Sequence, residues 1–388
     1  MVDILCFNIG SSSLSLGAFR VSGEEQVATF EGGVDLSAER TVALRPAGGP
    51  PRTLDLPDPS DFPAVALGLL DAVSAEINDP GVLVVAHRVV HGGQRRLPAA
   101  RLDAELIREL DALAPLAPLH QPAGLGAARA ITAARPRLRQ VAVFDTAFHA
   151  TLPALARTLP LPRTFATAGL RRFGFHGLSY AWVGRHMARV APACRRIVAL
   201  HLSGGSSACA ILDGRSADTT MGATPLGGLM MATRAGSVDP GLLLYLLEER
   251  GLTPDALSRL LWHESGLLGV SGCSDDLRDL LAADDPRAEL AIALYCRSAA
   301  KAAAEMTVSL GGIDALVFTG GIGAEHPGIR ARIAGDLGVL GVALDAAANA
   351  AGAERISPRG APVEVRAFPA EEERIMAIEA ARLLETEE

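Results

Sequence analysis

The chain has 388 residues, of which 49% are hydrophobic and 21% are charged, and its formal net charge at pH 7 is −8. This composition is typical of a globular protein and excludes a disordered chain, and the length favours two domains. The sequence has no run of lysine or arginine that could follow a nucleic-acid backbone, so we expect no nucleic-acid partner.

The chain opens on a predicted β-hairpin over residues 3–19, DILCFNIGSSSLSLGAF. Two apolar runs flank Gly10, which can adopt the positive φ of a tight turn. The backbone N–H groups and the three serine hydroxyls of such a turn can hold phosphate oxygens, and Asn8 could reach a metal ion. An ordinary serine-rich hairpin is the alternative for this stretch alone.

Residues 26–63 read as edge strands and turns, and residues 62–77 as a helix. A buried strand over 82–86 then delivers HRVVHGG to its carboxyl end, where ligands bind in open α/β sheets. Arg88 in this motif suits a carboxylate or a phosphate through paired hydrogen bonds. A structural salt bridge is the alternative role for Arg88.

Asp145 directly follows the next predicted strand, 140–144, which comes after predicted helices at 103–113 and 123–134. An aspartate at this place can hold a water, orient a base or contact a metal ion, or it can cap the following helix. The proline- and threonine-rich residues 151–168 are the predicted crossing between the domains.

A second hairpin is predicted over residues 197–212, IVALHLSGGSSACAIL, and it repeats the plan of the first. Two similar hairpins this far apart indicate two halves built alike, each offering a loop to a cleft between them. A third glycine turn, FTGGIG, follows the predicted strand 315–317.

The other predicted elements of the second half are helices and one strand. Asp239 and Pro240 begin a helix that ends at Gly251, and glycines 311 and 312 end another. The predicted elements are the helices 180–190, 240–251 and 286–310, the strand 363–367, and a final helix from Arg374.

Cysteine usage and hydropathy bear on the compartment. The five cysteines are odd in number and form no CxxC pair, which fits a reducing compartment. The amino terminus enters a strand pattern at once, with no basic region or cleavage site. The longest uncharged stretch, residues 112–128, contains three prolines, so no membrane span is expected. We predict a cytoplasmic protein.

Taken together, these segments resemble the acetate kinase family of carboxylate kinases. The matching motifs keep the family order across the chain, and they are NIGSSSL, HRVVHGG, APLH, VFDTAFH, FGFHG, DTTMGATPLGGL, TRAGSVDPG, LLGVSG, FTGGIG and the terminal EEE segment. The resemblance implies two α/β domains of the duplicated sugar-kinase, actin and heat-shock-ATPase architecture (ribonuclease H-like), with an interdomain cleft. We assign them to residues 1–150, completed by the helix 374–388, and to residues 151–373, which would bind the nucleotide and form a homodimer.

The resemblance also implies reversible, Mg²⁺-dependent, direct in-line phosphoryl transfer from ATP to acetate, giving acetyl phosphate and ADP. Mn²⁺ could replace Mg²⁺. The implied catalytic residues are Arg88, Asp145, His176 and Arg234, and the metal would be supported by Asn8 and Glu372. Substrate binding would use Arg88, Val90, Leu119, His120, Phe175 and Pro225. Nucleotide binding would use Ser11, Ser12, Ser13, Ser15, His201, Leu202, Ser203, Gly204, Gly205, Asp276, Leu277, Arg278, Gly321, Ile322, Gly323, Ala324 and Glu325.

The chain departs from the family pattern on the nucleotide side. The lysine usual after the serine hairpin is Ser15, and the second histidine usual after FHG is Tyr180. The usual HLGNG and GIGEN are HLSGG and GIGAE here. The alternatives are therefore a kinase for propionate or another short carboxylate, a pyrophosphate-using enzyme, and an ATP-binding relative without catalysis.

Overall fold

The computed structural model of the chain describes residues 2–10, 13–23, 25–35, 41–46, 49–55, 57–58, 61–75, 83–94 and 98–387. The chain forms two units, which we call the first unit (Met1–Ala147 with Glu371–Glu388) and the second unit (Phe148–Ala370). The predicted domain limits at 150 and 373 fall within a few residues of these boundaries. The carboxyl-terminal segment thus returns to the unit in which the chain begins.

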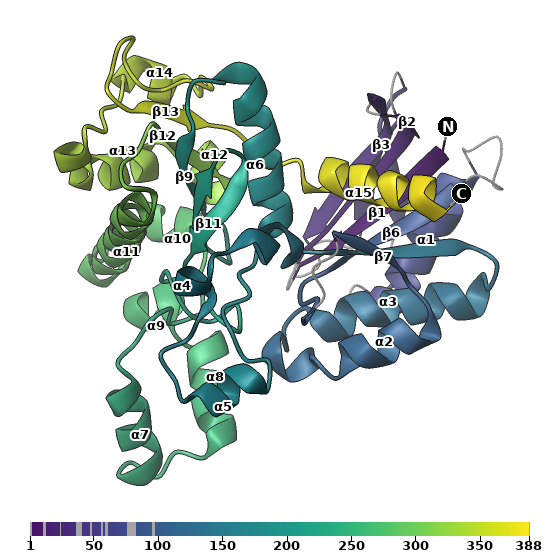
Figure 1. Ribbon diagram of the computed structural model, residues 1–388, viewed down its shortest axis with the longest axis horizontal. Helices are drawn as coiled ribbons and strands as arrows, with labels where there is room; N and C mark the ends of the chain where they lie inside the picture. Colours follow the sequence, from purple (N-terminus) through teal and green to yellow (C-terminus); the bar gives the residue numbers. More distant parts are fainter. Residues whose placement is uncertain are drawn as a thin grey trace. The chain divides into compact units, whose positions relative to one another are not determined.

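The first unit is built on an eight-stranded sheet of order β5-β4-β3-β2-β1-β6-β8-β7 (Figure 1). The strands β1, β2 and β3 pair antiparallel, whereas β6 lies parallel to β1 and β8 parallel to β6. The carboxyl ends of β1, β6 and β8 therefore meet at one edge. The strand bounds are β1 (Val2–Ile9), β2 (Ser13–Ser22), β3 (Glu25–Asp35), β4 (Thr41–Pro46), β5 (Arg52–Asp55), β6 (Leu83–Val89), β7 (Ala99–Arg101) and β8 (Arg139–Phe144).

The second unit repeats this plan in a five-stranded sheet of order β11-β10-β9-β12-β13. Again the first three strands pair antiparallel, and β12 and β13 add in parallel beside β9. The same order and directions recur in β3-β2-β1-β6-β8, so the predicted duplication is confirmed. The bounds are β9 (Arg196–His201), β10 (Ser207–Leu212), β11 (Arg215–Thr219), β12 (Ala315–Thr319) and β13 (Glu364–Ala367).

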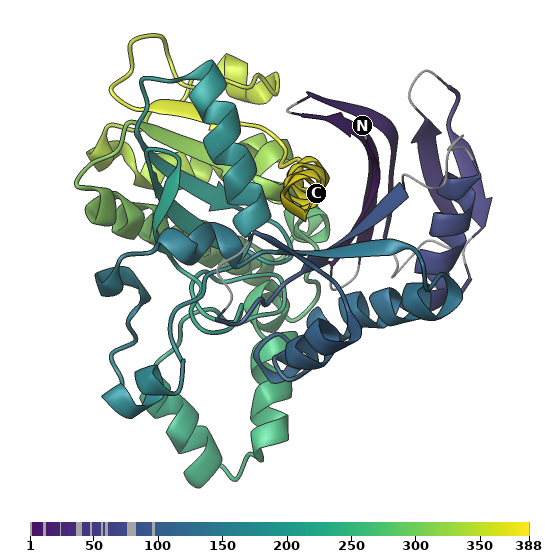
Figure 2. The same cartoon turned by 45° about the vertical axis from the view of Figure 1, so that its right-hand side comes forward.

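Helices cover both faces of the first sheet. Alternate residues of β1 face opposite sides, so Leu5 and Phe7 pack with α1 and α3 while Cys6 faces α15, its thiol 3.3 Å from the Glu373 carbonyl oxygen. Figure 2 shows α15 end-on, on the other side of the strands from α1. The bounds are α1 (Phe62–Ser74), α2 (Ala104–Asp111), α3 (Gln121–Ala134) and α15 (Glu372–Glu387).

The core of the second unit forms where α11 packs on the sheet. Its residues Ile292, Tyr295 and Ala299 are buried in one cluster with Leu200 and Leu316 of the strands. The helix covers the predicted range, with Asp285 as amino-terminal cap and left-handed Gly311 at its end. The helices are α4 (Ala154–Arg157), α5 (Arg163–Thr167), α6 (Gly177–Val190), α7 (Pro240–Glu248), α8 (Pro254–His263), α9 (Gly266–Ser271), α10 (Leu277–Ala282), α11 (Pro286–Leu310), α12 (Gly320–Glu325), α13 (Pro327–Asp336) and α14 (Ala346–Ala350).

Three local predictions differ from the structure. The predicted crossing 151–168 lies wholly within the second unit, where it forms the short helices α4 and α5. The glycine turn after β12 opens the helix α12, because Gly320 adopts φ +74° and lets the strand turn directly into a helix. The last helix begins at Glu372, so this glutamate lies in its first turn. Within the described part of the chain, no helix has both the length and the apolar content that a bilayer span requires.

Candidate functional site

Three strand ends bring polar side chains together in the first unit. Phe7 of β1 pairs with His87 of β6, so the following residues, Asn8 and Arg88, lie on neighbouring strands and on one face. Asp145 comes directly after β8, which runs parallel to β6, and its backbone N–H donates to the carbonyl of Val89 at 3.1 Å. The sheet topology thus assembles three predicted site residues.

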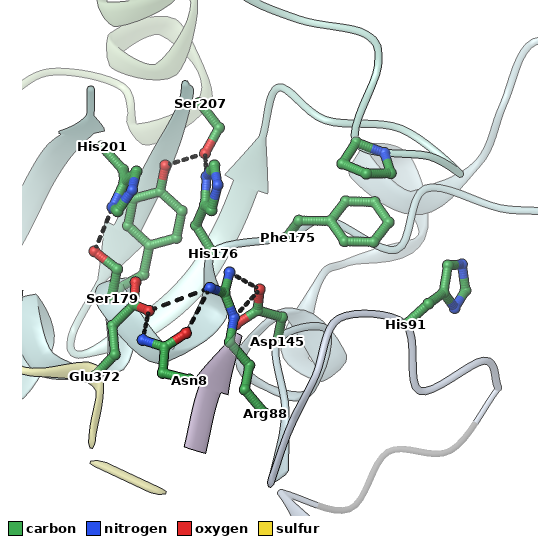
Figure 3. Close-up of polar contacts among 12 residues, drawn as sticks. Asn8, Arg88, His91, Asp145, Phe175, His176, Ser179, His201, Ser207 and Glu372 are labelled. Carbon is green, nitrogen blue, oxygen red and sulfur yellow. Dashed lines mark hydrogen bonds and ion pairs between the residues drawn. The ribbon is translucent and has the colours of Figure 1, made fainter. Parts of the chain in front are cut away.

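The Arg88 guanidinium is at the centre of this group (Figure 3). Its Nη2 and Nε donate to Asp145 Oδ2 at 2.6 and 3.1 Å, and its Nη1 donates to Asn8 Oδ1 at 2.8 Å. Glu372 Oε2 lies 3.6 Å from Nη1. Asp145 therefore binds Arg88, a contact that its position after a strand did not by itself indicate.

The Arg88–Asp145 pair is almost wholly withdrawn from solvent, with side-chain exposures of 11% and 0%. Burial opposes the charge on Arg88, but the carboxylates of Asp145, Glu372 and Glu373 outweigh it and raise the pKa of Arg88 above its usual value. Arg88 is therefore a fixed cation held in a fixed direction.

Asn8 links Arg88 to the first turn of α15. Its Nδ2 donates to Glu372 Oε2 at 2.9 Å and to Glu373 Oε1 at 2.8 Å. Ser15 Oγ donates to the same oxygen of Glu373 at 2.6 Å, so Ser15, a predicted nucleotide residue, contacts a carboxylate. Burial and the Glu372 charge raise the pKa of Glu373, against the hydrogen bonds from Ser15 and Asn8.

The oxygen ligands available here suit a hard cation. Mg²⁺ is commonly bound by one or two carboxylates together with water and substrate phosphates, and Asn8, Glu372 and Glu373 offer such oxygens. Among the described residues, no cluster of three or more His, Cys, Asp and Glu side chains could hold a metal ion by itself. Ser11 and Ser12 lie outside the described residues, and of Ser13 only the backbone is described, as the start of β2.

The predicted substrate residues of the first unit lie on two loops that are hydrogen-bonded to each other. Gln121, at the start of α3, accepts from the His91 N–H at 3.1 Å and donates to the His91 carbonyl at 3.0 Å. Val90, beside His91, is 5% exposed, whereas Leu119 and His120, just before α3, are half-buried. Gln121 was not predicted, because nothing local in APLHQP marks its long-range partner.

In the second unit, His176 directly precedes α6 as its N-cap and has a left-handed backbone conformation, with φ +56°. This conformation is uncommon for a residue with a side chain, and such residues cluster at functional sites. The nearby Gly174 also has a positive φ, and a Cβ there would lie 2.6 Å from the ring of His149. The motif FGFHG is therefore a sharp turn that only glycine permits beside the histidine.

The His176 ring is fixed on two sides. Its Nδ1 is hydrogen-bonded to Ser207 Oγ at 2.8 Å (Figure 3), and the ring stacks on His201 with centroids 4.2 Å apart. His201 Nδ1 is in turn hydrogen-bonded to Ser179 Oγ at 2.8 Å. Two predicted site histidines are thus brought into contact, and Ser207 and Ser179, which were not predicted, orient them.

Arg234 is the buried cation of the second unit's site, and it is 4% exposed. Its Nη1 donates to the carbonyl oxygen of Pro225 at 3.0 Å, and the guanidinium lies over the ring of Trp262, 5.6 Å from its centroid. Phe175 is 1% exposed, and its carbonyl is 2.9 Å from His149 Nε2. Pro225 and Arg234, two predicted residues, are therefore in direct contact.

Gly205 shows where Arg234 and His176 converge. A Cβ built on Gly205 would lie 3.3 and 3.6 Å from Arg234 Nη1 and Nη2, and 3.4 Å from His176 Nε2. The Arg234 guanidinium and His176 Nε2 therefore face one space beside Gly205, and a side chain at this position would crowd both groups. Because residue 205 is glycine, an anion can lie between the two groups in this space, which we call the anion site.

The glycine loops of the second unit are joined at Leu202. Its carbonyl accepts from the N–H groups of Ile322 and Gly323 at 2.9 and 3.2 Å. Gly320 must be glycine, because a Cβ there would lie 2.5 Å from the Leu202 carbonyl oxygen. The unpredicted Arg330 donates to the carbonyls of Gly323 and Ala324 at 3.0 and 2.7 Å, although its motif, IRAR, gives no sign of this.

The remaining predicted nucleotide residues lie around the start of α10 and the end of α12. Asp276 caps α10 and forms an ion pair with Arg278, with nitrogen and oxygen 2.6 Å apart. Leu277 is 2% exposed and belongs to the core, so only its backbone could reach a ligand. Glu325 is the last residue of α12. Ser203 lies elsewhere, in the loop between β9 and β10, where its N–H donates to Ser206 Oγ at 3.3 Å.

Comparisons with known proteins identify the family and the fold of the chain. The acetokinase family model matches residues 3–378. An acetate kinase of Rhodopseudomonas palustris is 41% identical over 383 residues, which are 96% of each chain. Crystal structures of an acetate kinase from Porphyromonas gingivalis and a propionate kinase from Francisella tularensis are 33% and 32% identical, with TM-scores of 0.84 and 0.86. The first alignment covers 99% of this chain and 100% of the Porphyromonas gingivalis chain, and the second covers 98% of this chain and 99% of the Francisella tularensis chain. The fold prediction is therefore confirmed.

Proposed function

The chain belongs to the acetokinase family, and from this premise we propose that it is an acetate kinase that transfers the γ-phosphoryl group of ATP reversibly to acetate. One observation carries the proposal. Each unit holds two of the four predicted catalytic residues, and in each unit one of the two is an arginine that is largely withdrawn from solvent. Arg88 is bonded to Asp145 in the first unit, and Arg234 faces the anion site beside Gly205 together with His176 in the second.

In the first unit, we assign Arg88 to the substrate carboxylate, since a guanidinium held by Asp145 keeps a fixed orientation. Val90, Leu119 and His120 would lie beside the substrate. Asn8 and Glu372 would support Mg²⁺, or Mn²⁺ in its place, and that cation would neutralise phosphate charge. Because Asn8 and Glu372 are also bonded to each other, the cation would be held partly through water.

In the second unit, we assign the anion site beside Gly205 to an oxygen of the migrating phosphoryl group. Arg234 and His176 Nε2 would donate to this oxygen, and stabilisation of such developing charge is the main catalytic task in phosphoryl transfer. Phe175 and Pro225 would close the small apolar pocket for the substrate methyl group.

The nucleotide would occupy the glycine loops of the second unit. The N–H groups of Ile322 and Gly323 donate to the Leu202 carbonyl, so the two glycine loops keep a fixed spacing on either side of a bound nucleotide. We keep Ser203, Gly204, Asp276, Arg278 and the segment 321–325 as nucleotide residues, and Ser11 to Ser13 as phosphate ligands.

The chemistry needs no general base. Acetate is already an anion at neutral pH, so its oxygen can attack the γ-phosphorus in line. One P–O bond forms to acetate while the bond between the γ-phosphorus and its bridging oxygen breaks, and ADP leaves with that electron pair. Asp145 therefore orients Arg88 and does not accept a proton.

Trapping of acyl phosphate by hydroxylamine tests the proposal directly, with acetate, ATP and Mg²⁺ as reactants. We expect product from the wild-type protein and a loss on the order of 10³-fold in turnover for Arg88→Ala, by analogy with arginine fingers. Arg20→Ala is the matched control, because Arg20 also binds an aspartate, Asp3, in a two-point contact on the same sheet but is 48% exposed. No product from folded wild-type protein would refute the proposal.

Propionate is the second candidate substrate, and the related Francisella tularensis structure is of a propionate kinase. One methylene group is worth only about 1–3 kcal/mol in an apolar pocket, so we expect both acids to react. Values of kcat/KM for acetate, propionate and butyrate decide between them. A donor screen with ATP, GTP and pyrophosphate tests the donor, and ATP binding without product would identify a non-catalytic relative.

We further propose a homodimer formed through α7 of the second unit. This helix buries none of its residues within the chain, although Leu242, Leu244 and Tyr245 are 46–56% exposed. An apolar helix left open in this way favours a partner surface. Light scattering should show a dimer that dissociates in Leu244→Glu but not in the control Val339→Glu, whose residue is 92% exposed.

We place the protein in the cytoplasm, because all five of its cysteines are free thiols, as expected in a reducing compartment. Cell fractionation tests this location, and recovery of the enzyme in a secreted or membrane fraction would contradict it.

A further inference from the structure

A buried chain of two hydroxyl groups ends on the ring of His176. Tyr180 Oη lies 2.5 Å from Ser207 Oγ, and Ser207 Oγ lies 2.8 Å from His176 Nδ1. The side chains of Tyr180 and Ser207 are both 0% exposed. Tyr180 stands one turn after His176 on α6, and Ser207 opens β10, so the chain joins two elements that fix the histidine.

The number of protons in this chain limits how it can be arranged. Ser207 has one proton, and if it donates that proton to His176 Nδ1, its oxygen accepts from Tyr180. The neutral His176 ring then carries its proton on Nε2. In the opposite arrangement Nδ1 donates to Ser207, Ser207 donates to Tyr180, and the neutral ring has a lone pair on Nε2.

The position of Nε2 decides between the two arrangements. A Cβ built on Gly205 would lie 3.4 Å from His176 Nε2 and 3.3 Å from Arg234 Nη1, so both groups face the anion site beside Gly205. A lone pair on Nε2 would repel an anion held between the two groups, whereas an N–H group would donate to it beside the guanidinium. Stacking on His201 holds the His176 ring in its orientation, with the planes of the two rings 23° apart.

We propose that Tyr180 is a positioning residue for phosphoryl transfer: acting through Ser207, it holds His176 in the tautomer whose Nε2–H faces the anion site. This inference rests on the proposed function for the role of that anion site. The hydrogen-bond chain itself belongs to the folded protein and can be measured without turnover.

Nitrogen NMR of the histidine rings tests the proposal, with His176→Gln used to assign the signals. In the wild-type protein Nδ1 of His176 should have the shift of an acceptor and Nε2 that of an N–H group. In Tyr180→Phe, which keeps the ring, we expect a mixture of tautomers. We also expect kcat to fall about tenfold, the value of one hydrogen bond of about 1.4 kcal/mol, with KM for acetate and ATP unchanged.

Tyr295→Phe is the matched control. Tyr295 is also buried, and its hydroxyl is hydrogen-bonded at 2.9 Å to Ser206, the neighbour of Ser207 in the sequence. Tyr295→Phe therefore removes a tyrosine hydroxyl oxygen from a buried tyrosine–serine hydrogen bond, as Tyr180→Phe does. The serine of this second pair is not bonded to His176. We expect the His176 nitrogen shifts of this variant to equal those of the wild-type protein.

Ser207→Ala provides the second test, including the case in which Tyr180→Phe does not fold. If Tyr180 acts through Ser207, the double variant should lose no more kcat than Ser207→Ala alone. Additive losses, or an unchanged His176 tautomer in either variant, would overturn the proposal. The wild-type protein could make no acyl phosphate and still show the Nε2–H tautomer of His176, with that tautomer lost in Tyr180→Phe. This result would refute the proposed function but would support the hydrogen-bond chain.

Discussion

Replacing Asp145 with asparagine should weaken both the first unit and its chemistry. The change keeps the shape of the side chain but removes the charge that accepts two hydrogen bonds from Arg88, at 2.6 and 3.1 Å. Breaking a buried ion pair costs about 3–5 kcal/mol. Because Glu372 remains 3.6 Å from the guanidinium, we expect the lower end, about 3 kcal/mol.

Hydrogen exchange measures this loss where it occurs. The amides of β1, β6 and β8 report the opening of the first unit alone, and their protection should fall by about two powers of ten, which corresponds to about 3 kcal/mol. Turnover should fall about a hundredfold, since Arg88 no longer has a fixed orientation. Hydroxamate trapping measures the turnover.

Asp103→Asn is the control for the chemical change. Asp103 caps α2 by accepting from the Leu106 N–H at 2.8 Å, and asparagine caps a helix about as well as aspartate. We expect wild-type exchange and turnover for this variant. Wild-type behaviour of Asp145→Asn in both assays would refute our account of the Arg88–Asp145 pair, whereas slow turnover with normal protection would assign the pair to function alone.

Three further predictions concern single residues. Gly205→Ala would place a methyl carbon 3.3 Å from Arg234 Nη1 and 3.4 Å from His176 Nε2. Acyl phosphate formation should then fall about a hundredfold, while the circular dichroism spectrum stays that of the wild-type protein. The control is Gly222→Ala, whose new methyl group would meet nothing within 4 Å and should leave turnover unchanged. Burial lowers the pKa of His87 to about 4, so its contribution to stability is complete above about pH 6.5 and declines as the pH falls toward 4, by about 3 kcal/mol in all. Urea unfolding at pH 7.5 and pH 5 measures this decline, which should be smaller in His87→Gln. Ser15→Ala removes the 2.6 Å hydrogen bond to Glu373 and should destabilise the first unit by about 1–2 kcal/mol. We expect the KM for ATP to stay unchanged. A raised KM for ATP would instead indicate that Ser15 contacts the nucleotide.

The sequence by itself determined those features whose physical cause is local. The helix α11 begins after Asp285 and ends at Gly311, because a capping carboxylate and a left-handed glycine act within one turn of the helix ends. The two hairpins were likewise predictable from apolar runs around small residues, and their similarity indicated the duplication. The order of motifs was enough to indicate the acetokinase family, because each motif is a short continuous segment.

Tertiary structure alone decided which side chains meet. Ser15 is bonded to Glu373, which is 358 residues away in the sequence, and nothing in the first hairpin indicates this partner. Leu277 lies in a polar motif but is buried in the core, and the hydroxyl chain to His176 joins a helix to a strand. No local pattern reports such contacts, because they depend on the packing of distant elements and the register of their strands.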